Sequence, residues 1–195
     1  MKILLTFFVL LFSSTVVAED ISDFEIEGIS IGDSLLDFYN KSEINNVPSY
    51  KYKNDKFIYY VFELNVNSNY DYLQITVKTN NNLNNKYIIH SISGIFICRN
   101  DIEKCFIKQN EIKKDLDLFF KQDSIKTKGN HNQDKSQKST WKNFAYFLSD
   151  SKYSDIDIIV YDNSKEFEEQ GQWDNLQVMI SSQEFSKFID EEAWN

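Results

Sequence analysis

The 195-residue chain is poor in arginine, proline and glycine. Arg99 is the only arginine, Pro48 is the only proline, and there are five glycines. Lysine, asparagine and isoleucine are abundant instead. AT-rich codons produce this composition, so we attach no functional meaning to the asparagine clusters.

Long apolar runs are absent beyond the N-terminus. Residues 1–18, MKILLTFFVLLFSSTVVA, combine one lysine, a short apolar run and small residues that end at Ala18. This pattern predicts a signal peptide that is cleaved between Ala18 and Glu19. The apolar run is shorter than the roughly 20 residues of a comfortable membrane span. We therefore expect an exported protein, periplasmic or secreted, with no stable membrane insertion after cleavage.

Basic residues are also fewer than acidic residues, 21 against 30. The formal net charge is −9, and the predicted signal peptide carries one lysine and no acid, so the mature chain would carry −10. Nucleic-acid binding depends on clustered lysine and arginine, and the sequence therefore argues against a nucleic-acid partner. Anionic membrane surfaces are disfavoured for the same reason, and we expect the acidity to serve solubility.

The two cysteines are Cys98 and Cys105, in the spacing C-x6-C. An even number of cysteines in an exported chain predicts a disulfide, here between a strand end and the first turns of the next helix. Two reduced cysteines in the core are the alternative. No C-x-x-C redox pair is present, so we assign neither cysteine a catalytic role.

Strand and helix patterns follow each other in groups. Leu73, Ile75 and Val77 alternate with polar residues, as in a half-buried strand, and Gly94 is expected to mark a bulge or a bend. The best helix pattern covers residues 100–122, where apolar residues recur at steps of three and four. The order α-βββ-α-loop-βββ-α predicts an α+β fold with antiparallel meander sheet packed by helices. A duplicated helix-βββ unit is a further interpretation of the same order.

The expected organisation has four parts. Residues 1–18 are the removed signal peptide, 19–120 form a helix-βββ-helix part, 121–139 form a flexible polar loop, and 140–195 form a βββ-helix part. The loop is assigned from its lack of apolar residues. We expect the two structured parts to belong to one domain.

The stretch IGDSLLDF, residues 31–38, carries the GDSL string of the SGNH hydrolases, in which the serine is a nucleophile. Such an enzyme also needs an Asp-x-x-His base near its C-terminus, and neither His90 nor His131 stands in that pattern. We therefore assign no catalytic residue and interpret Asp33 and Ser34 as helix-cap residues. A serine hydrolase that uses Ser34 remains the alternative.

Metal-binding patterns are weak, and we assign no metal and no cofactor. Asn65, Asn67, Asn69 and Asp71 alternate like calcium ligands, but Tyr70 stands where an EF-hand loop needs glycine. Most aromatic residues are assigned to the core. Some of them could form an exposed face for a protein or glycan partner, for example Tyr60, Tyr72 and Trp173.

Three stretches resemble a family of small exported proteins of uncharacterised function from AT-rich marine bacteria: FEIEGISIGDSLLDFY, SISGIFICRNDIEKCFIKQNEIKKDL and WDNLQVMISSQEF. The resemblance implies export but no activity. The stretch ISIGDSLLDF also resembles the strand-glycine-helix entry of the SmpA/OmlA and beta-lactamase-inhibitor-like folds, although the lipidated cysteine of the outer-membrane members is missing. That resemblance implies a non-enzymatic binding module.

We therefore expect an exported, non-enzymatic binding or structural module of the periplasm or cell envelope, with an unidentified protein or glycan as its partner. An envelope-assembly or inhibitor module that binds a protein through an aromatic sheet face is the second alternative, beside the serine hydrolase.

Overall fold

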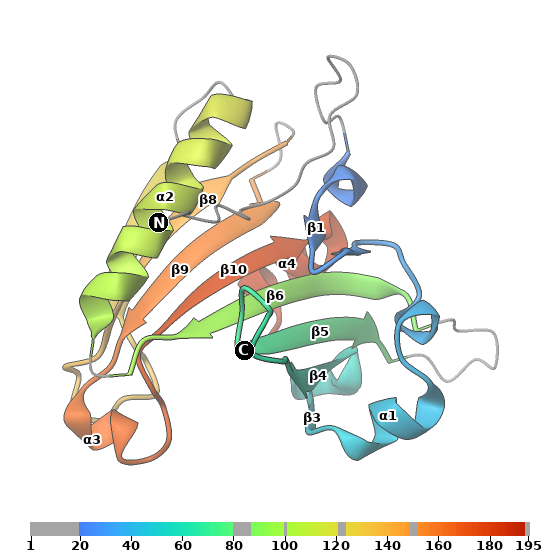
Figure 1. Cartoon of the computed structure of the whole chain (residues 1–195), viewed down its shortest axis with the longest axis horizontal. Helices are drawn as coiled ribbons and strands as arrows, with labels where there is room; N and C mark the ends of the chain where they lie inside the picture. The colour runs from blue at the N-terminus through green and yellow to red at the C-terminus, as the bar shows by residue number, and fades with distance from the viewer. Residues whose placement is uncertain (1–19, 80–86, 100, 121–123, 149–151, 194–195) are drawn as a thin grey trace.

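The computed structural model describes residues 20–79, 87–99, 101–120, 124–148 and 152–193 (Figure 1). The predicted signal peptide and its cleavage position lie outside the described residues. No helix within the described ranges is long and apolar enough to cross a membrane.

Eight strands form one antiparallel sheet in the order β3-β4-β5-β6-β10-β9-β8-β7. The expected α+β fold with antiparallel meanders is therefore confirmed, and strands from both expected parts share the one sheet. The strands are β3 (Ser49–Lys51), β4 (Phe57–Glu63), β5 (Tyr72–Lys78), β6 (Ile89–Ile97), β7 (Ile125–Asn130), β8 (Thr140–Tyr146), β9 (Ile156–Asp162) and β10 (Asn175–Ser181).

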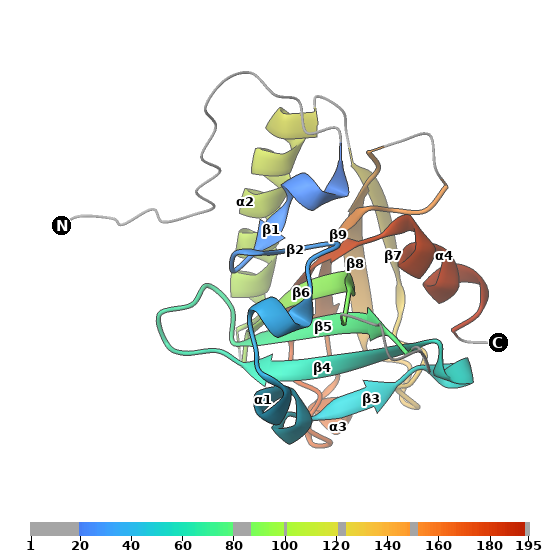
Figure 2. The same cartoon turned by 90° about the vertical axis from the view of Figure 1, so that its right-hand side faces the viewer.

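The strand order is symmetric about the pair β6–β10. The meander β4–β5–β6 leads into α2 (Ile102–Phe120), and the meander β8–β9–β10 leads into α4 (Gln183–Glu191). The two helices break this symmetry, because α2 and α4 lie on opposite sides of the sheet (Figure 2). Duplication of a helix-βββ unit therefore stays a prediction, supported by strand order alone.

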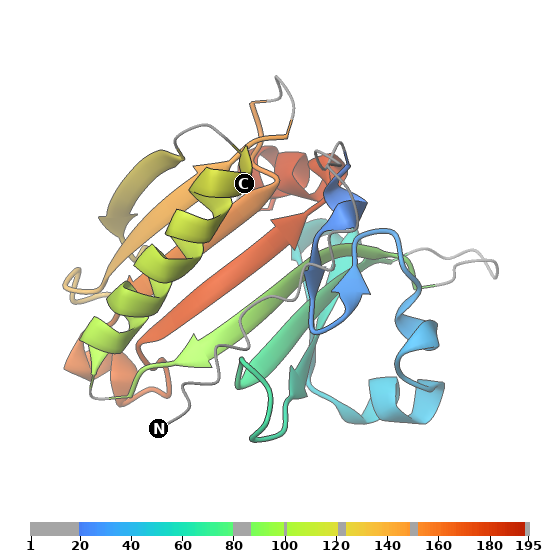
Figure 3. The same ribbon diagram turned by 45° about the horizontal axis from the view of Figure 1, so that its top comes forward.

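One side of the sheet, which we call the α2 face, carries the main hydrophobic core. Helix α2 packs against β9 and β10, and the hairpin β1 (Glu25–Ile26)–β2 (Ile29–Ser30) packs beside it on β6 (Figure 3). Leu73, Ile75 and Val77 are buried there, as their alternation predicts. Burial of an aliphatic side chain of this size contributes about 2–3 kcal/mol relative to exposure.

Helix α4 covers one end of the opposite side, which we call the α4 face (Figure 2). Phe185 and Phe188 of α4 pack on Phe57 of β4, with ring centroids 5.2 and 4.9 Å from the Phe57 centroid. Ser182 caps α4 by accepting a hydrogen bond from Phe185 N–H at 3.3 Å.

Short elements connect the sheet. Asn40 and Glu43 form a capping box at the start of α1, which explains why so short a helix is ordered. Glu27 and Gly28 both have positive φ, 52° and 77°, as a two-residue type I′ hairpin turn requires. The elements are η1 (Ile21–Asp23), η2 (Leu35–Asp37), α1 (Lys41–Asn46), η3 (Lys53–Asp55) and α3 (Lys165–Glu168).

Two expectations for the sheet are wrong. The polar segment 121–139 is not a flexible loop throughout, because Ile125–Asn130 forms the edge strand β7. This strand pairs with β8 along its whole length. Gly94 is not a bulge either, since it continues the register between Leu73 and Val178. The glycine is needed because the ring of Tyr70 lies where a Cβ would stand, 2.7 Å away.

Candidate functional site

Ser34 begins a helix in the structure. Its hydroxyl accepts a hydrogen bond from Leu36 N–H at 3.3 Å, as the N-cap of the 3-10 helix η2. Asp33 has a different role from the expected cap, because its carboxylate accepts from Ser30 N–H at 2.9 Å and closes the turn before the helix. A hydroxyl in this cap geometry is explained without a catalytic role.

Both histidines have partners away from the Ser34 turn. His90 Nδ1 lies 3.1 Å from Ser182 Oγ and 3.8 Å from Glu184 Oε2, on the α4 face. A serine, a histidine and an acid thus come together, but serine and acid both face the same ring nitrogen. A Ser-His-acid triad needs them on opposite nitrogens. This group is therefore better explained as an attachment of α4 to β6.

The environment of each histidine keeps its imidazole neutral. Burial lowers the pKa of His90, and the nearby Glu184 opposes that shift only in part. Burial also lowers the pKa of His131, whose ring packs against Phe167 at 4.9 Å and Tyr161 at 5.7 Å. Both imidazoles are therefore uncharged at neutral pH, and both serve packing.

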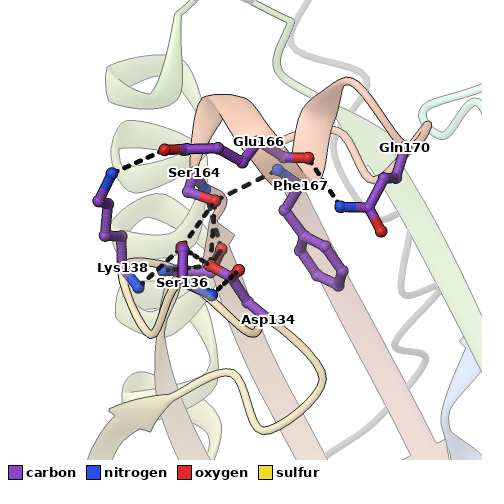
Figure 4. A network of polar contacts seen from close by, with 8 residues as sticks. Asp134, Ser136, Lys138, Ser164, Glu166, Phe167 and Gln170 are labelled. Carbon is purple, nitrogen blue, oxygen red and sulfur yellow. Dashed lines mark hydrogen bonds and ion pairs between the residues drawn. The ribbon is translucent and has the colours of Figure 1, made fainter.

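The segment after β7 contains a network around a buried carboxylate, Asp134 (Figure 4). Asp134 accepts hydrogen bonds from the hydroxyls of Ser136, Ser139 and Ser164 and from two backbone N–H groups, at 2.6–3.0 Å. These bonds hold the pKa of Asp134 well below its usual range. The carboxylate is saturated with donors.

This network ties the β7–β8 turn to α3. Ser164 is the N-cap of α3, and its own N–H donates to Ser139 Oγ at 2.8 Å. Outside the saturated centre, Lys138 pairs with Glu166 at 2.7 Å (Figure 4). Because each polar group has its partner within the network, the cluster is explained as a structural junction. The expected flexible loop is held here by tertiary hydrogen bonds.

The predicted disulfide is present. Cys98 and Cys105 have a sulfur–sulfur distance of 2.05 Å and join the end of β6 to the first turns of α2, as the spacing suggested. The bridge fixes the chain that contains Arg99, which lies directly after Cys98.

The α4 face carries a mixture of polar and aromatic side chains across its strands. The β6–β10 register places Ser93 opposite Met179 and Ile95 opposite Gln177 on this face. Burial raises the pKa of Tyr161 to about 12, so its phenol stays neutral. The face comprises Tyr59, Val61, Glu63, Tyr72, Gln74, Thr76, Ser91, Ser93, Ile95, Ile97, Trp141, Asn143, Ala145, Asp157, Ile159, Tyr161, Asn175, Gln177, Met179 and Ser181.

A groove of about 460 Å³ opens at the end of the sheet that lies away from α4, and residues from both faces line it. The β4–β5 connection forms one wall, and the disulfide-linked end of β6 forms the other. Its lining residues are Glu63, Leu64, Asn65, Val66, Ser68, Tyr70, Asp71, Tyr72, Phe96, Ile97, Cys98, Arg99 and Lys104. The volume is within the range of small-molecule sites, and the lining mixes apolar and charged groups.

Arg99 in this groove is stacked on Trp173. The guanidinium carbon lies 4.5 Å from the centre of the indole ring. The pair continues the β6–β10 ladder, because Ile97 faces Asn175 and Cys98 N–H donates to Asp174 O at 2.8 Å. Arg99 and Trp173 follow directly beyond the end of this ladder, and they meet there in the stacking contact.

The guanidinium has no carboxylate partner among the described residues, where each of the ion pairs involves lysine or histidine. By contrast, Lys104 in the same groove pairs with Asp101 at 3.3 Å. A stacked guanidinium keeps its planar fork of N–H donors oriented, which suits recognition of an anionic group. Arg99 is thus the best oriented free charge that we find in the described chain.

The expected aromatic candidates divide between the two faces. Tyr60 packs against the main core on the α2 face. Tyr72 lines the groove, and Trp173 supports Arg99 beside it. Sequence reasoning missed Arg99, because its rarity was attributed to codon composition. The register of β6 and β10 was the signal needed to find it, and that register is a tertiary property.

Within the described ranges, no group of three or more histidine, cysteine, aspartate or glutamate side chains is arranged to hold a metal ion. Asn65 and Asp71, from the calcium-like string, both line the groove. No family model, curated protein or solved structure matches this chain. The two resemblances noted in the sequence therefore stay predictions.

Proposed function

We propose that this chain is an exported, non-enzymatic binding protein whose ligand site is the groove at the end of the sheet that lies away from α4. The single observation that carries the proposal is the stacked Arg99 guanidinium, which lines a groove of about 460 Å³ and has no carboxylate partner in the described residues. An oriented charge beside exposed apolar groups is the usual composition of a small-molecule site.

Export is supported by two observations. The N-terminal 18 residues have the composition of a signal peptide, and the disulfide Cys98–Cys105 suits an oxidising compartment. The disulfide also borders the groove, so export and binding are connected physically. Oxidation would fix the wall that carries Arg99.

A binding role is favoured over catalysis by the arrangement of the nucleophile candidates. Ser34 and Ser182 both use their hydroxyls as helix caps. His90 faces serine and acid through one ring nitrogen. The groove lining itself contains no histidine, and its only cysteine sulfur lies in the disulfide.

A thermal-shift panel tests the proposal. Dipeptides, monosaccharides, disaccharides and short fatty acids would each be added to the wild type, to Tyr72→Ala in the groove, and to Leu118→Ala. Leu118 is a matched control, because it is an exposed apolar residue of α2 outside the groove lining. We expect at least one class to raise the melting temperature of the wild type and of Leu118→Ala.

The same class should have little effect on Tyr72→Ala. The proposal fails if no class raises the melting temperature of the wild type, or if Tyr72→Ala responds as strongly as the wild type does.

A further inference from the structure

We infer that the groove takes a short peptide, a zwitterion with an apolar body, with its carboxylate on Arg99 and its ammonium on the acidic wall at Glu63. This inference rests on the proposed function and specifies the ligand of that same groove.

The carboxylate end follows from Arg99. A guanidinium presents parallel N–H donors that match the two oxygens of a carboxylate. Stacking on the Trp173 ring at 4.5 Å occupies one face of the guanidinium and leaves the donors at its edge accessible. The disulfide at Cys98 and the hydrogen bond from Cys98 N–H to Asp174 O hold both backbones of the pair. The donor fork is therefore oriented before a ligand arrives.

The ammonium end follows from the opposite wall. Glu63 is exposed at the end of β4 and lines the groove. Asp71 lines it as well, and its Oδ2 accepts from Ile97 N–H at 2.7 Å, which fixes this second carboxylate beside β6. Among the described residues no lysine or histidine forms a salt bridge with Glu63, whereas Asp71 lies near enough to Lys108 to act on the pKa of that lysine. The register aligns Glu63 with Tyr72 and Ile95, four residues before Arg99, so negative charge lies in the same groove at a distance from the guanidinium.

The net charge distinguishes a zwitterion from a simple anion. The chain carries a formal charge of −9, so its overall field repels an anion that approaches Arg99. A zwitterion has no net charge, and only the local groups decide its binding. The apolar lining, which includes Leu64, Phe96 and the fully exposed Val66, provides contact for an aliphatic side chain.

Calorimetric titration of the oxidised protein tests this assignment with four probes and leucine itself as a fifth. The probes are the dipeptide Leu-Leu, its N-acetyl derivative without the ammonium, its C-terminal amide without the carboxylate, and the doubly blocked form. Free leucine distinguishes an amino-acid ligand from a peptide ligand. We expect Leu-Leu to bind more tightly than leucine, whose two charged groups are too close together to reach both walls, and each blocked end to weaken binding about 10- to 100-fold, the value of a charge-assisted hydrogen bond.

Two variants test which residue binds each charged end of the ligand. Arg99→Gln should weaken the parent ligand to the level of its amide and remove the difference between acid and amide. Glu63→Gln should weaken the parent ligand to the level of its N-acetyl derivative and remove the difference in affinity between these two probes. Leu118→Ala serves as the control with unchanged affinity, and circular dichroism would verify that each variant is folded.

The inference is overturned if the blocked probes bind as tightly as the parent, or if Arg99→Gln keeps the wild-type preference for the acid. If neither leucine nor Leu-Leu binds while a saccharide or fatty acid from the panel does, the zwitterion is wrong and the binding function stands. If no compound binds, both are wrong.

Discussion

The two faces of the sheet differ in what their side chains can do. The α2 face is covered by α2 and the β1–β2 hairpin, and its central residues Ile75, Ile92 and Ile158 are fully buried. The α4 face is covered by α4 at one end, and the groove lies at the other end of the sheet. Alternation along each strand gives one sheet these two surfaces. The first face holds the main hydrophobic core, and the second carries a mixture of polar and aromatic side chains, several of which are buried.

The largest expected effect on the free energy of unfolding comes from a substitution in the core of the α2 face. Ile158→Ala should lower the free energy of unfolding by about 2–5 kcal/mol, because it leaves a cavity under α2. Gln177 lies on the neighbouring strand but on the α4 face, and it is half-buried. Gln177→Ala should change the free energy of unfolding by about 0.5 kcal/mol or less. Urea denaturation measures both, and equal losses would remove the distinction between the faces.

Removal of the disulfide should have the second largest effect on the free energy of unfolding. The disulfide closes a loop of sequence separation seven, for which the chain-entropy model gives about 2.5 kcal/mol. Cys98→Ser with Cys105→Ser should lower the free energy of unfolding by this amount, measured by urea denaturation. The same pair of changes should weaken ligand binding in the groove more than Leu118→Ala does, since Arg99 is then less well held. A loss of stability with no loss of affinity would show that the disulfide does not support ligand binding in the groove.

A smaller effect concerns two buried carboxylates with opposite pKa shifts. Asp134 accepts five hydrogen bonds, which lower its pKa. Asp157, on the α4 face, accepts two, from Asn143 and Ser154, and burial raises its pKa. Hydrogen bonding therefore outweighs desolvation at Asp134, whereas desolvation outweighs hydrogen bonding at Asp157.

The pH dependence has a definite sign for each. The Asp134 contribution is present above the ordinary pKa of 3.8 and is lost as the pH falls below it. The Asp157 contribution is favourable below 3.8 and is lost as the pH rises through its raised pKa. At pH 7, Asp134→Asn should therefore destabilise and Asp157→Asn should stabilise. Thermal unfolding at pH 3 and pH 7 tests this, and shifts of the same sign at pH 7 would contradict it.

Titration of the histidines should give the smallest change in stability. Both have a lowered pKa, so the stability that each contributes is present above the ordinary value of 6.5 and is lost as the pH falls. His131→Gln should reduce the loss of stability between pH 7 and pH 5, measured by urea denaturation at each pH. An unchanged slope would show that His131 is not desolvated in the fold.

Much of the fold follows from the sequence because its patterns are local. The period of α2, the alternation of Leu73 with Ile75, and the spacing of the cysteines all act within one element or one connection. The α+β class and the disulfide follow from these patterns.

The wrong expectations share a tertiary cause. Strand β7 is polar because five of its six residues are exposed at the edge of the sheet, and only its backbone needs a partner. Composition therefore made it resemble a loop. Gly94 was assigned to a bulge, but the ring of Tyr70 explains it, and that contact is not visible in the local sequence.

The candidate site was beyond sequence reasoning for the same reason. Arg99 and Trp173 are 74 positions apart, and they become neighbours only when β6 pairs with β10. No local pattern encodes that pairing.

The most direct test of the central claim is a map of amide chemical shifts, recorded while the panel compound with the largest thermal shift is added. The account predicts that the perturbed amides cluster at the groove, at Tyr72, Ile97 and Arg99, and leave the exposed side of α2 around Leu118 unchanged. Perturbations that instead centre on α2, or on the Asp134 junction, would contradict it.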